Sequence, residues 1–157
     1  MSEPTLVVSK IRAGTVIDHI PAGRALDVLK IIGLSGREGT RTAIIMNVES
    51  KKLGKKDIVK IEGKFLGQHE VSIIALIAPT ATINIVEDFK VVRKFKVEIP
   101  EVIEEIIICP NTTCITNKSN EPIKSRFRVL SRKPITMQCS YCSTLISEDD
   151  LYGLIKV

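Results

Sequence analysis

The first hundred residues alternate between short apolar runs and two longer stretches with helical spacing. Apolar residues recur between Ala25 and Ile32 at the interval of one helical face, and Gly33 follows them. A second helix is predicted over 67–78, where "GQHEVSIIALIA" runs up to Pro79. The pattern therefore predicts two helices in this part of the chain.

The other apolar runs are rich in β-branched residues, which favours strands. They lie at 5–13, 41–48, 57–63, 80–88 and 90–99. The stretch "GTVIDHIP" (14–21) is interpreted as a turn. The resulting order, strand–helix–strand–strand–helix–strand with an extra strand, is typical of a ferredoxin-like layer. We therefore expect an α+β fold, in which an antiparallel sheet carries both helices on one face.

Pro100 marks the start of a second part with a different pattern. From 101 on, short apolar runs are separated by turn residues, which predicts a small all-β domain. A domain of fewer than about 60 residues has a marginal core, so a structural staple is expected. The expected domains are residues 1–99 and residues 101–157.

The four cysteines of the chain all fall in the second part, as C-x4-C at Cys109 and Cys114 and C-x2-C at Cys139 and Cys142. Two tight turns that each present two thiolates can close tetrahedrally around Zn²⁺. Four unrelated buried thiols fit this clustering poorly, and a redox "CSYC" needs no second pair. Iron binds the same four sulfur donors and remains an alternative, but zinc is preferred for a structural site. We predict one structural zinc ion per chain, with no open position for a substrate.

Composition and charge narrow the functional classes. The chain has 157 residues, 44% of them hydrophobic but only 4% aromatic, and its net charge is +5. Residues 1–100 contain 16 Lys and Arg against 11 Asp and Glu, whereas 101–157 contain seven of each. A bound anion is therefore expected on the first domain. Neither a signal peptide nor an apolar run of membrane-spanning length is found, which predicts a cytoplasmic protein with no membrane partner.

Several basic residues of the first domain are placed to meet an anion. Lys60 interrupts an apolar strand, and His19 stands beside Asp18 just before the first helix, where Asp18 could equally cap that helix. Lysines from different strands and a histidine near a helix start can together bind a polyphosphate. Strict alternation along 90–97 places four residues on one face: Lys90, Val92, Lys94 and Lys96.

Neither a glycine-rich phosphate loop nor a Ser–His–acid or Cys–His arrangement is present in the sequence. We therefore predict no catalytic residue and expect the chain not to be an enzyme.

Four stretches together resemble one known family nearly end to end. They are "GTVIDHIPA" (14–22), "LGKKDIVKIE" (53–62), "LIAPTATINIVEDFKVV" (76–92) and the frame "CPNTTCITN"…"CSYC". In these motifs, their order and their separations, the chain is similar to the regulatory chain of aspartate carbamoyltransferase, the enzyme that opens pyrimidine synthesis.

The resemblance implies a non-catalytic subunit that binds nucleotides through residues 1–99 and docks on the catalytic chain, which forms trimers, through the zinc domain 101–157. It also implies a regulatory dimer, inhibition by CTP, often with UTP, and activation by ATP at the same site. Asp18 is expected on the ribose side, Lys60 near the base or ribose, and His19 and Lys94 near the phosphates. The expected pocket lining is Ile11, Val16, Asn84, Val86, Phe89 and Val91, and the expected zinc ligands are Cys109, Cys114, Cys139 and Cys142.

Two departures from the family pattern concern recognition of the base. Ahead of the first turn the family often has a glutamate, an alanine and two basic residues, where this chain has Ser9–Ala13. Phe89 stands where the family can have a tyrosine. The sequence therefore leaves open which nucleotide inhibits and which activates.

The alternative is a nucleic-acid-binding zinc-ribbon protein, which would use the same basic residues and cysteines. The second part is neutral, however, and four thiolates with Zn²⁺ bring it to about −2. Stacking aromatics are also scarce. We therefore expect no nucleic-acid partner.

Overall fold

The computed structural model describes residues 10–156, and these form two compact units that meet in sequence between Val97 and Glu98. Each unit has its own sheet. None of the helices among the described residues is long and apolar enough to cross a membrane.

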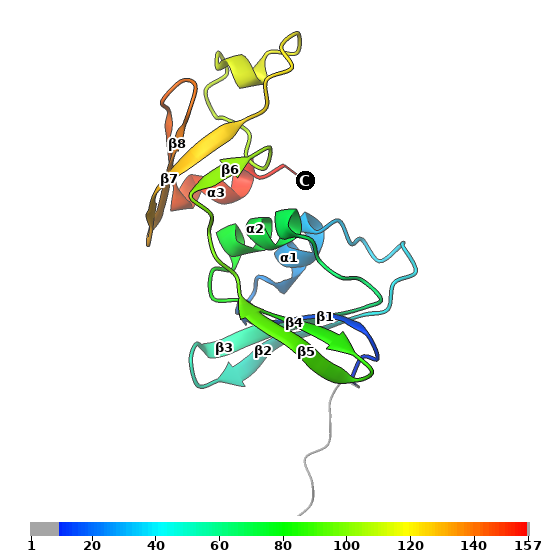
Figure 1. Cartoon of the computed structure of the whole chain (residues 1–157). Helices are drawn as coiled ribbons and strands as arrows, with labels where there is room; N and C mark the ends of the chain where they lie inside the picture. The colour runs from blue at the N-terminus through cyan, green and yellow to red at the C-terminus, as the bar shows by residue number, and fades with distance from the viewer. Residues whose placement is uncertain (1–9, 157) are drawn as a thin grey trace, which may run out of the picture. The chain divides into compact units, whose positions relative to one another are not determined.

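The first unit is an antiparallel sheet of five strands with the order β2-β3-β1-β4-β5. Helices α1 (Ala25–Ile31) and α2 (Gln68–Ile77) both lie on one face of it (Figure 1), which confirms the predicted α+β class. The strands are β1 (Gly14–Pro21), β2 (Thr42–Ser50), β3 (Gly54–Glu62), β4 (Thr82–Glu87) and β5 (Lys90–Lys96).

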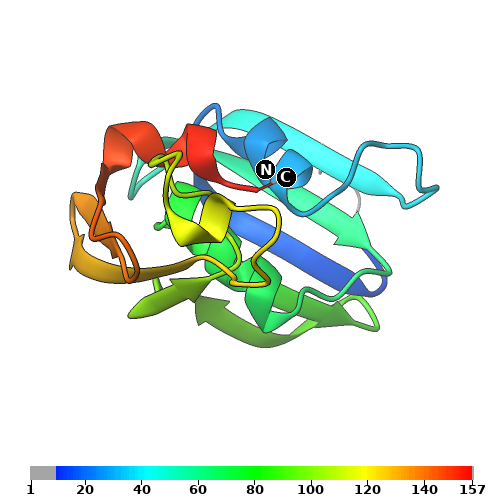
Figure 2. The same ribbon diagram turned by 90° about the horizontal axis from the view of Figure 1, so that it is seen from above.

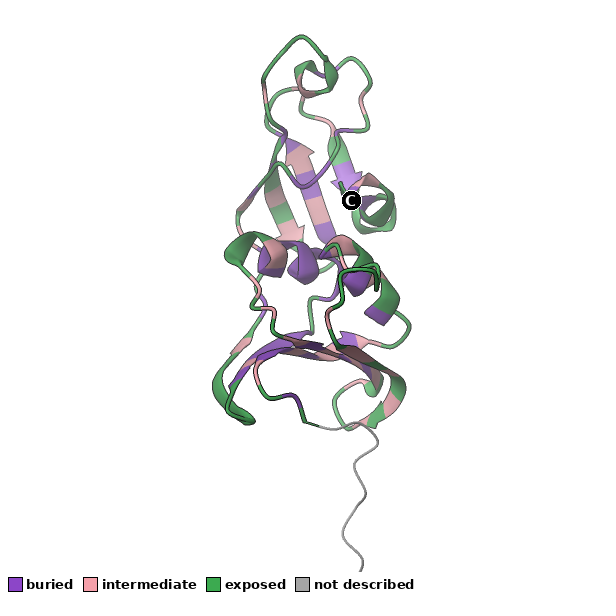
Figure 3. Ribbon diagram, turned by 90° about the vertical axis from the view of Figure 1, so that its right-hand side faces the viewer, coloured by how far each residue is buried: buried purple, intermediate pink, exposed green. Residues whose placement is uncertain are grey.

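The core of this unit lies between the helices and the central strands. Ile17 of β1, Val59 of β3 and Ile83 of β4 are fully buried, as are Val28 of α1 and Ile74 of α2. Figure 2 shows β1 in the middle of the sheet, and Figure 3 shows buried residues concentrated where the helices and strands face each other. Because side chains alternate along a strand, the neighbours of these core residues point to the opposite, outer face.

One predicted element was misplaced. The stretch 14–21, interpreted as a turn, is the central strand β1, while Lys10–Ala13 of the predicted strand 5–13 are not in a strand and residues 5–9 lie outside the described part. A break in the register explains why these residues resemble a turn. It lies in β1 between Ile17 and Ile20, and His19 within it has a φ of 57°. Such a β-bulge admits residues that an ordinary strand disfavours.

Asp57 of β3 lies where two bulges meet. Strand β2 is also irregular, between Ile45 and Val48. The fully buried Asp57 carboxylate accepts hydrogen bonds from the backbone of Asn47 in the β2 bulge (2.9 Å), Gly23 after β1 (2.8 Å) and Ala25 at the start of α1 (3.0 Å). Helix α1 has no cap from its own N-cap side chain, so Asp57 serves that end as well.

The second unit has a four-stranded antiparallel sheet in the order β6-β7-β8-β9, followed by helix α3 (Glu148–Leu154), which the sequence analysis did not predict. Phe127, Met137 and Ile146 are buried at the centre of its core, and Leu151 of α3 is buried too. The strands are β6 (Val102–Glu104), β7 (Arg126–Arg132), β8 (Ile135–Cys139) and β9 (Leu145–Ser147).

Replacement of Asp57 by asparagine is expected to lower the free energy of unfolding by about 2–4 kcal/mol, because the new NH₂ group faces a backbone N–H and leaves a buried donor unsatisfied. Urea denaturation measures this. Asp88→Asn is the matched control: Asp88 is exposed in the β4–β5 turn with a φ of 51°, which asparagine tolerates. Equal stabilities of the two variants would contradict the role given to Asp57.

Candidate functional site

The first candidate site is the cluster of four cysteines in the second unit. All four sulfur atoms lie within 4.8 Å of one another. The Sγ atoms of Cys109 and Cys142 are 3.5 Å apart, and those of Cys114 and Cys139 are 3.8 Å apart. Four sulfurs at about 2.3 Å from a tetrahedral ion are separated by about 3.8 Å, so the donor set fits a single Zn²⁺.

Local hydrogen bonds shape the first of the two turns that carry the cysteines. The side chain of Asn117 donates to the carbonyl oxygens of Cys109 (2.8 Å) and Asn111 (2.7 Å), while Asn111 Oδ1 accepts from the backbone and hydroxyl of Thr113. These bonds hold the C-x4-C loop closed around its two sulfurs.

The second turn follows β8 directly. The backbone N–H of Cys139 donates to the Thr144 carbonyl (2.9 Å), and Ser143 N–H donates to the Cys139 carbonyl (3.0 Å). Ser143 has a φ of 65°, which reverses the chain at this point. The turn therefore presents Cys139 and Cys142 on the same side.

The electrostatics of the metal-free thiols fit a cation site. Burial raises the pKa of Cys109 and of Cys139 above the ordinary value for a thiol. Burial also acts to raise the pKa of Cys142, but hydrogen bonds from Thr144, Asn111 and Cys109 outweigh it and lower that pKa to about 6. A divalent cation reverses the cost of burial, because it stabilises all four thiolates at once.

The second candidate site is the outer face of the five-stranded sheet, where the structure brings together the residues predicted to bind nucleotides. Val16 of β1 is the register partner of Lys60 in β3 and of Asn84 in β4, and Asn84 is the partner of Lys94 in β5. Partners in an antiparallel sheet point to the same face. These four residues therefore form one row across four strands, and the Asn84 amide donates to the Val16 carbonyl at 3.3 Å.

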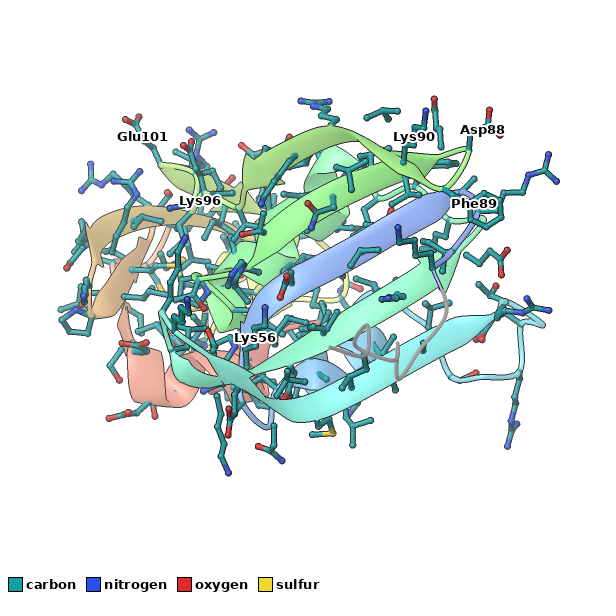
Figure 4. All side chains as sticks on the ribbon, turned by 90° about the horizontal axis from the view of Figure 1, so that it is seen from below. Lys56, Asp88, Phe89, Lys90, Lys96 and Glu101 are labelled. Atoms are coloured by element: carbon teal, nitrogen blue, oxygen red, sulfur yellow. The ribbon has the colours of Figure 1, made fainter. Side chains whose placement is uncertain are left out.

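A second row contains the charged end of this face. Asp18 pairs with Thr82, and Thr82 pairs with Lys96. Lys56 of β3 contacts Asp18, with 2.9 Å between Nζ and Oδ1. Figure 4 shows Lys56 and Lys96 toward the same end of the sheet.

His19 sits at this charged end, in the β1 bulge. Its Nδ1 lies 3.1 Å from the Thr82 hydroxyl, and its carbonyl accepts a hydrogen bond from Thr80 (2.7 Å). Burial is the largest cause of a pKa below the ordinary value for histidine. Asp18 opposes this shift, and the positive charge of Lys56 adds to it. An anion bound nearby would therefore change the pKa of His19.

The other end of the face contains apolar residues and a cavity that charged residues also line. Val86 pairs with Val91, and Ile11 is buried beside the start of β1. Phe89 lies in the β4–β5 turn, where the residue is 55% exposed and its N–H donates to the Arg12 carbonyl. Figure 4 shows Phe89 at the end of the sheet away from Lys56 and Lys96. A cavity of about 390 Å³ is lined here by Lys10, Ile11, Arg12, Arg41, Ala43, Glu62 and Phe89.

The predicted alternation along 90–97 was wrong in one respect. Lys94 and Lys96 do lie on the outer face, but the register of β4 and β5 shifts between Ile85 and Val86, and Lys90 pairs with Glu87. Since Glu87 follows Val86 directly, Lys90 points to the opposite face. The cause is the bulge, which reverses the alternation within β5.

Sequence reasoning also left Lys56 out of the site. The alternation of the regular strand β3 places Lys56 on the same face as Lys60, so the period of the strand could have indicated it.

A ferredoxin-like unit followed by a unit with four clustered cysteines that could hold a metal ion defines a protein built from two compact binding units. Comparison with family models makes the class specific. Residues 6–98 match the allosteric domain of the aspartate carbamoyltransferase regulatory chain, and residues 101–152 match the metal binding domain of that chain. The chain belongs to the aspartate carbamoyltransferase regulatory chain family, whose members are regulatory and not catalytic.

Individual proteins that carry this family name are similar over nearly their whole length. The regulatory chain of Hyperthermus butylicus is 62% identical over 146 residues, which cover 93% of this chain and 91% of that protein. The regulatory chain of Staphylothermus marinus is 57% identical over 151 residues (96% and 92%), and that of Pyrobaculum islandicum is 60% identical over 146 residues (93% and 97%).

Replacement of Cys114 by serine is expected to abolish metal binding and unfold the second unit, because metal-binding free energy contributes directly to folding in small domains. Metal content measured by mass spectrometry should fall from one ion per chain to none, with loss of circular-dichroism signal from the small sheet. Ser140→Ala is the matched control, since Ser140 lies between Cys139 and Cys142 without being a ligand. Full metal content in Cys114→Ser would rule out the four-sulfur site.

Proposed function

We propose that the chain is the regulatory subunit of an aspartate carbamoyltransferase, and that it binds CTP, UTP and ATP on the outer face of its five-stranded sheet. The observation that carries this proposal is the row formed by Lys60, Val16, Asn84 and Lys94 beside the bulge at His19. The row combines cations from two strands with an amide and an apolar floor, which suits a nucleotide better than a metal ion or a neutral ligand.

The distribution of charge across this face gives the nucleotide an orientation. His19, Lys94, Lys96 and Lys56 gather at one end of the face, and Phe89 and the cavity lie at the other. The five residue-to-residue steps from Gly14 to His19 span about 16 Å, which suits an extended nucleoside triphosphate. We place the phosphates at His19 and Lys94, the ribose near Asp18 and Lys60, and the base near Ile11, Val86, Phe89 and Val91.

The metal is proposed to be zinc, one ion per chain, with a structural role. Four thiolates complete a tetrahedral shell and leave no position for a substrate. The ion would supply the folding energy that a small unit cannot obtain from its own core. Reduced thiols of this kind fit the cytoplasm.

The second unit is proposed to dock on the catalytic chain, as expected for a subunit that regulates catalytic trimers. Its surface carries several large apolar side chains: Ile108, Leu130, Tyr141, Leu145 and Tyr152 are all at least 40% exposed. Such side chains are enriched in protein interfaces.

The first unit is proposed to pair with a second copy through its edge strand β2. Among the described strands β2 is at an edge of the sheet, and Ile44 and Met46 on it are exposed. A groove of about 730 Å³ beside it is lined by apolar residues of α1, including Leu26 and Leu29. An unpaired strand edge next to an apolar groove is suited to isologous pairing with the same edge of another copy.

Regulation would follow from unequal affinity of the nucleotides for two states of the assembly. A ligand shifts such an equilibrium only by its differential affinity, and coupling between sites is typically about 1–3 kcal/mol. Pyrimidine feedback then requires that CTP favour the less active state and that ATP compete for the same site.

Lys94→Ala should weaken CTP and ATP alike by about tenfold, since both ligands carry a triphosphate. Calorimetric titration of the metal-loaded chain measures both affinities. Lys90→Ala is the matched control, because Lys90 is on the same strand but points to the other face. Loss of only one nucleotide would place the phosphates elsewhere. Silence with nucleotides, together with salt-sensitive binding of a short DNA duplex, would favour the nucleic-acid-binding alternative.

Nucleotide binding should also take up protons at His19. Its pKa is below the ordinary value in the free chain, and a bound phosphate raises it, so affinity should increase as pH falls through the pKa of the bound state and level off below that of the free state. Calorimetry at pH 7 in two buffers with different ionisation enthalpies counts the protons. Uptake should be smaller in His19→Gln; identical uptake in the two proteins would remove His19 from the phosphate site.

A further inference from the structure

The second unit contains a cavity that has no part in the cysteine cluster. Its volume is about 340 Å³, and its lining includes Glu104, Ile123, Lys124, Ser125, Arg126 and Tyr141. These residues come from β6, from the segment that leads into β7, from the first residue of β7 and from the turn between Cys139 and Cys142. The cavity therefore lies where three separate chain segments meet.

A buried hydroxyl in this lining lacks a hydrogen-bond partner. Ser125 is only 4% exposed. Within residues 10–156, its Oγ is the one buried side-chain nitrogen or oxygen atom that forms no hydrogen bond. Folded proteins satisfy nearly all such groups, because a buried polar atom without a partner costs free energy. A group bound in the cavity is the natural candidate for the missing partner.

Backbone hydrogen bonds hold this part of the lining in place. The Ser125 carbonyl accepts from the N–H of Glu105 (3.0 Å), and the Arg126 carbonyl accepts from the N–H of Ser140 (2.9 Å). Ser140 is the residue after Cys139, so the second cysteine turn is joined directly to the start of β7. Ser125 therefore belongs to a fixed junction between β6, β7 and this turn.

The charges around the cavity favour an anion. The lining has two cations, Lys124 and Arg126, against one carboxylate, that of Glu104. Arg126 bonds to Glu104 at 2.9 Å, and Lys124 pairs with Glu105, but both ion pairs are largely exposed and contribute little to the stability of the free chain. An ammonium group has three donors and a guanidinium group five, so each cation can also serve a second carboxylate.

The setting of the cavity points to a protein partner. Tyr141 lines it and is 49% exposed. Tyrosine is enriched in protein interfaces, because it combines an apolar ring with a polar hydroxyl. Tyr141 also belongs to the exposed apolar surface through which the second unit is proposed to dock on the catalytic chain. The cavity is therefore continuous with that surface.

We infer that this cavity receives an aspartate or glutamate side chain of the catalytic chain, and that Ser125 donates a hydrogen bond to its carboxylate. Lys124 and Arg126 offset the negative charge of the incoming group. Ser125 is thus a docking residue, whose hydroxyl has no partner in the free chain and gains one in the assembly. The inference rests on the proposed docking function and specifies the chemistry of the partner group.

Ser125→Ala separates docking from folding. The dissociation constant of the full metal-loaded chain from catalytic trimers, measured by biolayer interferometry, should rise about tenfold, as expected for the loss of one hydrogen bond to a charged group. The urea midpoint of the free variant should be equal or higher, because the unsatisfied hydroxyl is gone. Ser131→Ala is the matched control: Ser131 is a half-buried serine of β7 outside the lining, and its replacement should leave the affinity unchanged.

Glu104→Gln tests the sign of the incoming charge. It removes the carboxylate of the lining, so an acidic side chain of the partner should bind several-fold more tightly at low ionic strength. Weaker association in Glu104→Gln would mean that the cavity receives a cation, and this would overturn the inference.

The inference and the docking function fail in different ways. Unchanged affinity in Ser125→Ala, or weaker docking that is accompanied by a lower urea midpoint, would overturn the role of Ser125 while the wild-type chain still docks. Failure of the wild-type chain to bind catalytic trimers, with its metal content intact, would overturn the proposed docking as well.

Discussion

The buried carboxylate of Asp57 is the interaction on which the arrangement of the first unit depends. Two bulges lie on either side of β3 at this point, one in β1 and one in β2, and bulges leave backbone N–H groups without ladder partners. Asp57 accepts from one such N–H, at Asn47, and from two more at the start of α1. A single buried side chain thus joins the bulge in β2 to the start of α1.

The second unit is stabilised in a different way, through its four clustered cysteines. Large side chains such as Phe127 and Met137 are fully buried in its core, but the two cysteine turns have almost no regular structure. Asn111 and Asn117 shape the first turn, but short hydrogen bonds near the surface contribute only about 1 kcal/mol each. A metal ion bound by the four thiolates would supply far more, so these four residues would contribute to both the shape and the stability of this unit.

The sequence was sufficient for the fold class and for the four cysteines that the structure brings together, because helical spacing, strand order and Cys spacing are local signals. It failed at the bulges. The Asp, His and Pro residues of β1 resembled a turn, since a bulge tolerates them for the same steric reasons, and the shift between β4 and β5 reversed the expected direction of Lys90. Glu62 and Arg41 are twenty-one residues apart in sequence, and only the pairing of β2 with β3 brings them to one cavity. Helix α3 is short and Leu151 is its one buried residue, so the sequence shows almost no helical periodicity of apolar residues there.

The bulge in β2 has a consequence for assembly. On the free edge of the sheet, regular strand geometry extends over Thr42–Ile45 before the bulge at Met46 and Asn47 interrupts it. A strand added from outside would therefore find a short template, and a continuous ribbon of many chains could not propagate along it. The edge strand is thus long enough to pair with one further strand but too short to template fibril growth.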